Sequence, residues 1–167
     1  SEVVESGKRT KFAVFMDWAS KKAAVSKLIE VPAENHAEPT GEMVIESFER
    51  DWLQHHPKNQ WIFSDPGGCY VSDDFVEWCG ISGIGIITSP GEAHHVTGIV
   101  ENCIRLIKTT AEKLKETFPV ASYMTRLWAA VAAHNNQSRT AGFSPNQWAF
   151  GADGNPDHQF PSAGLLN

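Results

Sequence analysis

The fold is most readily inferred from the segment Gln60-Trp-Ile-Phe-Ser-Asp-Pro-Gly-Gly68. It begins as a short apolar strand, residues 60–64, and ends in a turn signal. A polar cap and two acids then start a helix over residues 73–79, which Gly80 is expected to end. Residues 84–87 form another apolar strand. A strand, a helix and a strand in this order predict two parallel strands with the helix as their crossover.

The pattern on both sides of this stretch predicts an α/β fold. Upstream, residues 11–18 and 22–31 resemble strands, and their link is short enough to require an antiparallel hairpin. Helical spacing of apolar residues is seen over residues 41–55, 96–117 and 122–135, and a short capped helix is expected between Ser144 and Gly151. We therefore expect a mixed sheet flanked by helices.

Length and composition indicate a folded, non-membrane protein. With 167 residues we expect one domain at residues 8–151, and terminal extensions at 1–7 and 152–167. Hydrophobic residues make up 41% of the chain, which excludes disorder and collagen-like repeats. No apolar run is long enough to span a bilayer. Three cysteines without a C-x-x-C spacing favour a reducing, intracellular compartment.

The net charge is uneven along the chain. Its total of −6 argues by itself against a nucleic-acid-binding protein. However, residues 1–95 carry 15 acids and 8 bases, whereas residues 96–167 carry 5 acids and 6 bases. Any contact with a polyanion is therefore expected to be local, in the second half.

Two acids are candidates for a shared site. Asp65 follows a buried strand, at the edge where α/β folds carry ligand-binding residues, although it is also a typical turn former before Pro-Gly-Gly. Glu101 lies on the polar face of the 96–117 helix, where an ion pair with Arg105 is the simplest alternative. Thirty-five residues separate the two acids, and the segment between them runs helix, strand, loop and helix.

Several segments together resemble the catalytic core of retroviral and retrotransposon integrases, copia-like elements most of all. The spacing of Asp65 and Glu101 is one such feature. The others are Phe15-Met-Asp-Trp-Ala-Ser20, Ser64-Asp-Pro-Gly-Gly68, Ser89-Pro-Gly-Glu-Ala-His94, Gly98-Ile-Val-Glu-Asn102, His134-Asn-Asn136 and Thr140-Ala-Gly-Phe-Ser-Pro-Asn-Gln-Trp-Ala-Phe-Gly151. They stand in the order of the family, and the resemblance covers about residues 8–151.

The resemblance implies a ribonuclease-H-like fold and two-metal phosphoryl transfer, by which DNA ends are processed and joined to a target. It makes Asp65 and Glu101 the catalytic ligands of Mg²⁺ or Mn²⁺, ions that prefer carboxylate oxygens. Thr97, Arg105 and Lys108 share the helix face of Glu101 and become candidates for contact with DNA phosphate, a solvated face being the alternative. A homo-oligomer or larger assembly is implied, without a membrane, and the nucleus is the expected location of an active enzyme.

One expected carboxylate is not evident. Asp17 is a candidate for the family's first catalytic acid, but Asp17-Trp-Ala-Ser20 resembles instead the second strand, where a structural Asp is usual. The first acid would then precede Ser1, in a longer chain, or be replaced, and the first strand would be missing or truncated. The loop His94-His-Val-Thr-Gly98 also lacks the aromatic and amide residues often found in the family, which weakens the expected contacts with DNA.

Two other functions stay open. A degenerate or domesticated core would be catalytically inactive and serve as a scaffold or interaction module, which the net charge and the missing acid favour. A metal-dependent nuclease of the same fold would use the same carboxylates on another substrate. We expect the carboxyl groups of Asp65 and Glu101 to lie close enough to share an ion, with Asp17 displaced from them. We also expect negligible strand transfer by this chain alone.

Overall fold

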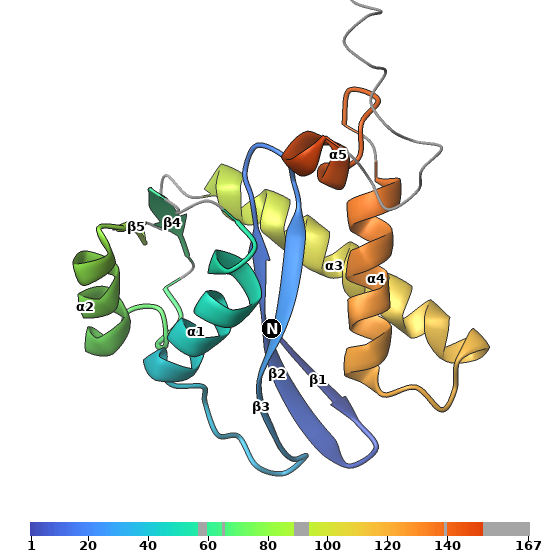
Figure 1. The fold of residues 1–167 in the computed structure, drawn as a ribbon. Helices are drawn as coiled ribbons and strands as arrows, with labels where there is room; N and C mark the ends of the chain where they lie inside the picture. The colour runs from blue at the N-terminus through green and yellow to red at the C-terminus, as the bar shows by residue number, and fades with distance from the viewer. Residues whose placement is uncertain (57–59, 65, 89–93, 139, 152–167) are drawn as a thin grey trace, which may run out of the picture. The chain divides into compact units, whose positions relative to one another are not determined.

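The computed structural model describes residues 1–56, 60–64, 66–88, 94–138 and 140–151, and the side chains of 94–97 are not among the described ones (Figure 1). The strands are β1 (Glu2–Glu5), β2 (Lys8–Met16), β3 (Ala23–Pro32), β4 (Trp61–Phe63) and β5 (Gly85–Ile87). The helices are α1 (Gly41–Phe48), the π-helix η1 (Glu49–Leu53), α2 (Asp73–Ser82), α3 (His94–Thr117), α4 (Tyr123–Gln137) and α5 (Pro145–Phe150). The expected α/β fold is confirmed.

The chain divides into two compact units. The first contains Ser1–Phe15 and Ala24–Leu106, and the second contains Met16–Ala23 and the chain from Ile107 onward. Helix α3 therefore begins in the first unit and ends in the second. None of the helices in the described part of the chain is long and apolar enough to cross a membrane.

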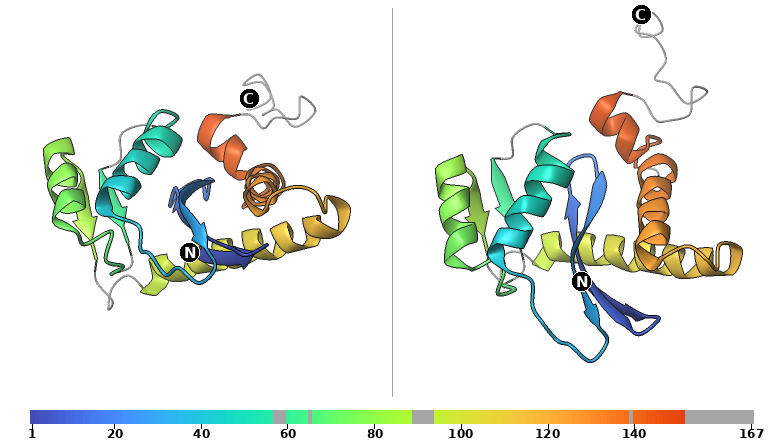
Figure 2. Two further views of the ribbon diagram at one scale, coloured as in Figure 1. Left: turned by 90° about the horizontal axis from the view of Figure 1, so that it is seen from below. Right: turned by 60° about the horizontal axis from the view of Figure 1, so that its bottom comes forward.

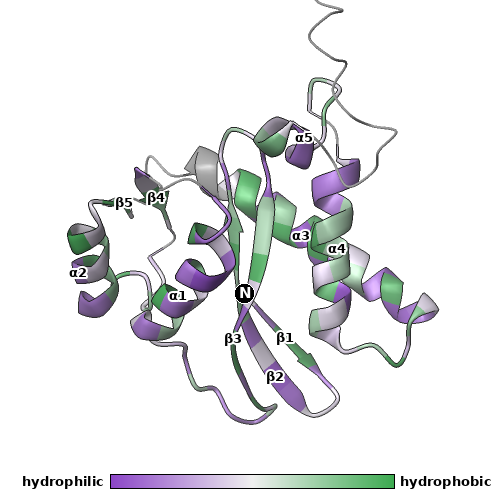
Figure 3. Ribbon diagram, viewed as in Figure 1, coloured by the Kyte–Doolittle hydropathy of each residue, from purple (hydrophilic) through white to green (hydrophobic). Residues whose placement is uncertain are grey.

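Strands β1, β2 and β3 form a three-stranded sheet in that order. β1 lies within the expected N-terminal extension and pairs antiparallel with β2, from Glu2 opposite Lys11 to Glu5 opposite Lys8. The chain between β2 and β3 is too short for a crossover, so these strands are antiparallel, as predicted. Along β2 the colour changes from hydrophilic in the first half to hydrophobic in the second (Figure 3).

β4 and β5 are parallel, with Ile62 opposite Ile86, and α2 is the helix between them. This confirms the predicted crossover unit. Among the described residues the two strands form a sheet of their own beside the three-stranded one, so parallel and antiparallel pairs both occur but in separate sheets.

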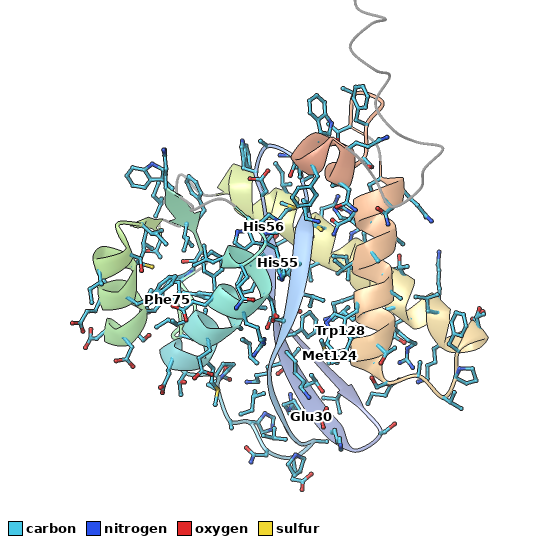
Figure 4. The ribbon with its side chains drawn as sticks, viewed as in Figure 1. Glu30, His55, His56, Phe75, Met124 and Trp128 are labelled. Carbon is cyan, nitrogen blue, oxygen red and sulfur yellow. The ribbon has the colours of Figure 1, made fainter. Side chains whose placement is uncertain are left out.

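One face of the β4–β5 pair packs on a hydrophobic core. Val44, Phe75, Cys79 and Ile84 form its buried centre, and Ile62 packs against them. Figure 4 shows Phe75 between α1 and α2. The two helices meet closely at Gly41, where an added Cβ atom would lie 2.0 Å from the Ser72 hydroxyl oxygen. The core therefore holds the middle of β4, and Asp65 stands two residues after the strand ends.

Two helix ends differ from the expectation. The helix predicted over residues 41–55 is α-helical only to Phe48 and continues as η1. The prediction that Gly80 ends α2 is wrong: the helix continues to Ser82, and Gly83 terminates it in the left-handed conformation with φ 64°. The amide of Gly83 donates to the carbonyl groups of Cys79 and Gly80, which satisfies the end of the helix.

The second unit contains two helices with capped N-termini, α4 and α5. Ser122 caps α4 by accepting the Thr125 amide, and Ser144 caps α5 in a reciprocal capping box with Gln147. Pro145 occupies the first turn of α5, and Gly151 ends that helix, both as predicted. In both views of Figure 2, α5 follows at the C-terminal end of α4.

Candidate active site

The candidate site lies at the carboxyl edge of the β4–β5 pair. The Ser64 amide donates to the Ile87 carbonyl at 3.3 Å, so the two strands are still paired where β4 ends. Because the strands are parallel, both leave the sheet at the same edge. Asp65 comes next after Ser64, and the connection to α3 leaves after Ile87. Ligand-binding residues of open α/β sheets are found at such edges.

Asp65 itself lies outside the described residues, but the chain makes backbone hydrogen bonds both before and after it. The Ser64 hydroxyl is buried and has no hydrogen-bond partner within the described part of the chain. After Asp65, the Tyr70 amide donates to the Gly67 carbonyl at 2.9 Å and forms a turn. The Ser72 hydroxyl donates to the Cys69 carbonyl at 3.0 Å and accepts from the first turn of α2. The turn is thereby anchored to the start of α2.

Helix α3 carries Glu101 on its exposed side. Cys103, Ile107 and Ala111 are buried along one face, as the periodicity predicts. Glu101 lies on the exposed face, two turns from the start of the helix. The side chain of Thr97, one turn earlier, lies outside the described residues.

The predicted alternative for Glu101, an ion pair with Arg105, is not formed among the described residues. The Arg105 guanidinium instead donates from Nη2 to Asn102 Oδ1 at 2.7 Å. Glu101 has no hydrogen bond or ion pair with another described residue. Its carboxylate thus remains available to a ligand. Arg105 is exposed and Lys108 is half-buried, at one and two helical turns beyond Glu101.

Asn102 was not among the predicted site residues, although its position could have indicated a role. It is three residues before Arg105, which is a spacing that brings helical side chains together.

Asp17 has a structural role in the turn between β2 and β3. Its carboxylate oxygen Oδ2 accepts the amide and the hydroxyl of Ser20, both at 2.7 Å. The Asp17 carbonyl accepts the Lys21 amide at 2.9 Å. These bonds agree with the interpretation of Asp17 as a structural Asp. Its position relative to Asp65 stays a prediction.

The described residues contain no group of three or more His, Cys, Asp or Glu side chains that could hold a metal ion. Of the two predicted ligands, Glu101 is described and its exposed carboxylate suits a hard cation such as Mg²⁺. Asp65 is not described, so the approach of the two carboxyl groups to each other stays a prediction.

Known structures share this fold. The HTLV-2 integrase catalytic core domain, in a dimeric complex with magnesium, matches with a TM-score of 0.72 and 20% identity over 89% of this chain and 90% of that one. The integrase of a simian T-cell lymphotropic virus intasome, in complex with the PP2A regulatory subunit B56 gamma, matches with a TM-score of 0.76 and 19% identity over 98% of this chain and 55% of that one. The catalytic core domain of BIV integrase matches with a TM-score of 0.67 and 17% identity over 89% and 90%.

The sequence comparisons give no further relative. No protein-family profile matches the chain. No curated protein sequence matches it either. At 17–20% identity the structural matches establish the fold, which is the ribonuclease-H-like fold of integrase catalytic cores.

Proposed function

We propose that this chain is the catalytic core of a retroelement-derived integrase, in which Asp65 and Glu101 bind divalent metal ions for phosphoryl transfer on DNA. One observation carries the proposal. In a chain with the integrase-core fold, the strand that leads to Asp65 and the strand that leads to α3 leave the same edge of a parallel pair. Glu101 faces outward on α3 without a partner among the described residues.

The metal would be Mg²⁺ or Mn²⁺. Carboxylate oxygens are the ligands such ions prefer, and two bound ions activate the attacking oxygen and stabilise the leaving one. Glu101 would contribute one carboxylate from α3, and Asp65 would contribute another from the end of β4. Two carboxylates hold two cations weakly, so we expect negligible strand transfer by this chain alone.

The substrate would be DNA, with its phosphates along α3. Arg105 is exposed one turn beyond Glu101, and its guanidinium is already oriented by Asn102. Lys108 continues the same side of the helix, and Thr97 precedes it by position. Because the whole chain carries −6, we expect this contact to be local and sensitive to salt. Action on chromosomal DNA would place the protein in the nucleus, as a homo-oligomer or part of a larger assembly.

The test of the site is a double-mutant cycle on metal binding. Mn²⁺ would be titrated against the chain and followed by the relaxation rate of water protons. We expect Asp65→Asn and Glu101→Gln each to weaken binding, and the double variant to weaken it by less than the sum, since both remove ligands of one ion. Glu112→Gln, an exposed acid on the same helix, is the matched control. Additive effects, or an effect as large for Glu112→Gln, would contradict a shared site.

A second candidate is a catalytically inactive scaffold with this fold. The observation that favours it is that the carboxylate of Asp17, the other candidate for a catalytic acid, is bound by the amide and the hydroxyl of Ser20. The assay that separates the candidates is joining of DNA ends by residues 1–167 in Mn²⁺. Robust joining that Asp17→Asn abolishes would make Asp17 the first catalytic acid and exclude the scaffold.

A further inference from the structure

The turn between β2 and β3 holds an exposed tryptophan in a rigid setting. Trp18 follows Asp17, whose carboxylate accepts both the amide and the hydroxyl of Ser20. The Asp17 amide donates to the Lys22 carbonyl at 2.9 Å and closes the hairpin. Lys21 has a positive φ of 61°, so it completes the turn in the left-handed region. A tight turn of this kind leaves Trp18 little freedom to lose on binding.

Helix α4, in the same unit, holds this turn from the other side. His134 Nε2 lies 3.0 Å from the Lys21 carbonyl oxygen, so this nitrogen carries the donated proton. Asn135 makes two hydrogen bonds to the backbone of Ala23, at 2.9 and 2.8 Å. Together they hold the turn at Lys21 and at Ala23. Its tip is thus presented by the fold and does not depend on a partner for order.

Two aromatic rings in this unit each carry a lysine ammonium group. Lys21 Nζ lies 4.1 Å from the centre of the Trp18 ring, and Lys22 Nζ lies 4.7 Å from the centre of the Phe150 ring. Lys22 also donates to Asn146 Oδ1 at 2.7 Å, and burial lowers the pKa of its amine. Trp18 is 47% exposed and Phe150 is 55% exposed. We call Trp18, Lys21, Lys22 and Phe150 the Trp18–Phe150 surface.

The charge around the Trp18–Phe150 surface is positive in a negative protein. Residues 17–22 contain two lysines and one acid, Asp17, whose Oδ2 is already bound by Ser20. Residues 134–151, which include the end of α4 and all of α5, contain no acid at all. The charge of these two segments therefore favours an anion over a cation as a ligand.

We propose that the Trp18–Phe150 surface binds single-stranded nucleic acid. Exposed aromatic rings beside cations suit such strands. The flat face of an unpaired base can stack on a ring, and each phosphodiester linkage carries a negative charge that a lysine attracts. In a duplex the base faces are already stacked, so the rings would gain little from it. The choice of nucleic acid as the partner rests on the proposed function, and the surface includes neither Asp65 nor Glu101.

The test is the binding of a fluorescein-labelled oligothymidylate of about 15 nucleotides to the 167-residue chain, followed by anisotropy in EDTA. We expect Trp18→Ala to raise the dissociation constant at least about fivefold, which is the lower end of the loss for one stacked base. Trp18→Phe keeps a ring and should retain most of the binding. Lys21→Gln should lower the slope of log K against log salt by about 0.7, the value for one phosphate contact of a single strand.

Matched controls exist in both units. Trp128, on α4 (Figure 4), is 52% exposed, and none of the described lysines lies over its ring, so Trp128→Ala should leave oligonucleotide binding unchanged. Lys27 is exposed on β3, and Lys27→Gln should keep the salt slope. Asp65→Asn and Glu101→Gln should bind the oligonucleotide normally in EDTA, which separates this inference from the proposed metal site.

Several results would overturn the inference. These are no binding of the oligonucleotide, an equal loss in Trp128→Ala, or equal competition by a duplex of the same length. A fall in sedimentation coefficient of Trp18→Ala without any oligonucleotide would also overturn it, because the surface would then be a contact between copies of the chain.

Discussion

The side-chain amide of Asn135 forms both backbone hydrogen bonds of Ala23. The Ala23 amide donates to Asn135 Oδ1 at 2.9 Å, and Asn135 Nδ2 donates to the Ala23 carbonyl at 2.8 Å. Both residues are buried. At the first residue of β3 a helix side chain thus makes the hydrogen bonds that a neighbouring strand would make. Without them a buried amide and a buried carbonyl would have no partner, which would lower the stability of the folded chain.

We expect Asn135→Ala to lower the free energy of unfolding by about 3 kcal/mol, because it leaves two buried backbone groups without partners. Urea denaturation measures the change. Gln137→Ala, an exposed position on the same helix, should stay within about 0.5 kcal/mol of the parent. Equal losses for both variants would show that the amide pair contributes nothing beyond the helix.

Most elements could be predicted because their signals are local. The hairpin follows from the short link between two apolar strands, and the buried face of α3 follows from helical spacing. The end of α2 could not be predicted, because Gly80 and Gly83 are both suited to a helix end. Only the fold shows that Gly83 takes the left-handed conformation while Gly80 stays helical.

This difference gives a paired prediction. Gly83→Ala should destabilise the chain by about 1 kcal/mol, since alanine disfavours a φ of 64°. Gly80→Ala should stabilise it by about 0.5–1 kcal/mol, because the position is helical and an added Cβ atom meets nothing within 4 Å. Thermal unfolding followed by circular dichroism compares the two. Destabilisation by Gly80→Ala would place the helix end where the sequence suggested.

The roles of single residues in the candidate site could be predicted from the sequence, but their hydrogen-bond partners could not. Turn chemistry at Asp17 and the exposed side of Glu101 both follow from local pattern. The partner of Arg105 does not, because spacings of three and four residues both bring helical side chains together, and the structure selects Asn102. Whether the carboxyl groups of Asp65 and Glu101 approach each other stays a prediction, because no periodic pattern specifies the path between β5 and α3.

Stability should depend on pH through Asp51. Burial alone would raise the pKa of Asp51, but hydrogen bonds from Arg50 and Ser26 outweigh it and hold the pKa below the usual value. Arg50 lies 2.8 Å from the Asp51 carboxylate, and the buried Ser26 hydroxyl donates to the same oxygen. Since the unfolded state binds this proton more readily, the stabilisation is present above the unfolded pKa of about 3.9. It is lost as pH falls through the lower folded pKa.

We therefore expect Asp51→Asn to reduce stability at neutral pH and to flatten the loss of stability in acid. Urea midpoints measured from about pH 6 down to about pH 2.5 would show both effects, a window that spans the unfolded pKa. Ser26→Ala removes one of the two hydrogen bonds and should give an intermediate slope. An Asp51→Asn chain that loses stability in acid as steeply as the parent would assign the pH dependence to other carboxylates.

The reactivity of the three thiols tests how α3 packs beside Glu101. Cys103 and Cys79 are buried, and burial raises the pKa of Cys103 to about 11 and raises that of Cys79, whereas Cys69 is half-buried. At about pH 8 the thiolate fraction of Cys103 is then roughly a hundredfold or more below that of an ordinary cysteine. Iodoacetamide followed by peptide mass spectrometry should show Cys69 alkylated first, and all three at similar rates in guanidinium. Cys103 is two residues from Glu101 and lies on the opposite side of α3. If Cys103 in the native chain were alkylated as fast as Cys69, the face of α3 that carries Cys103 would not be buried, and the outward position of Glu101 would lose its support.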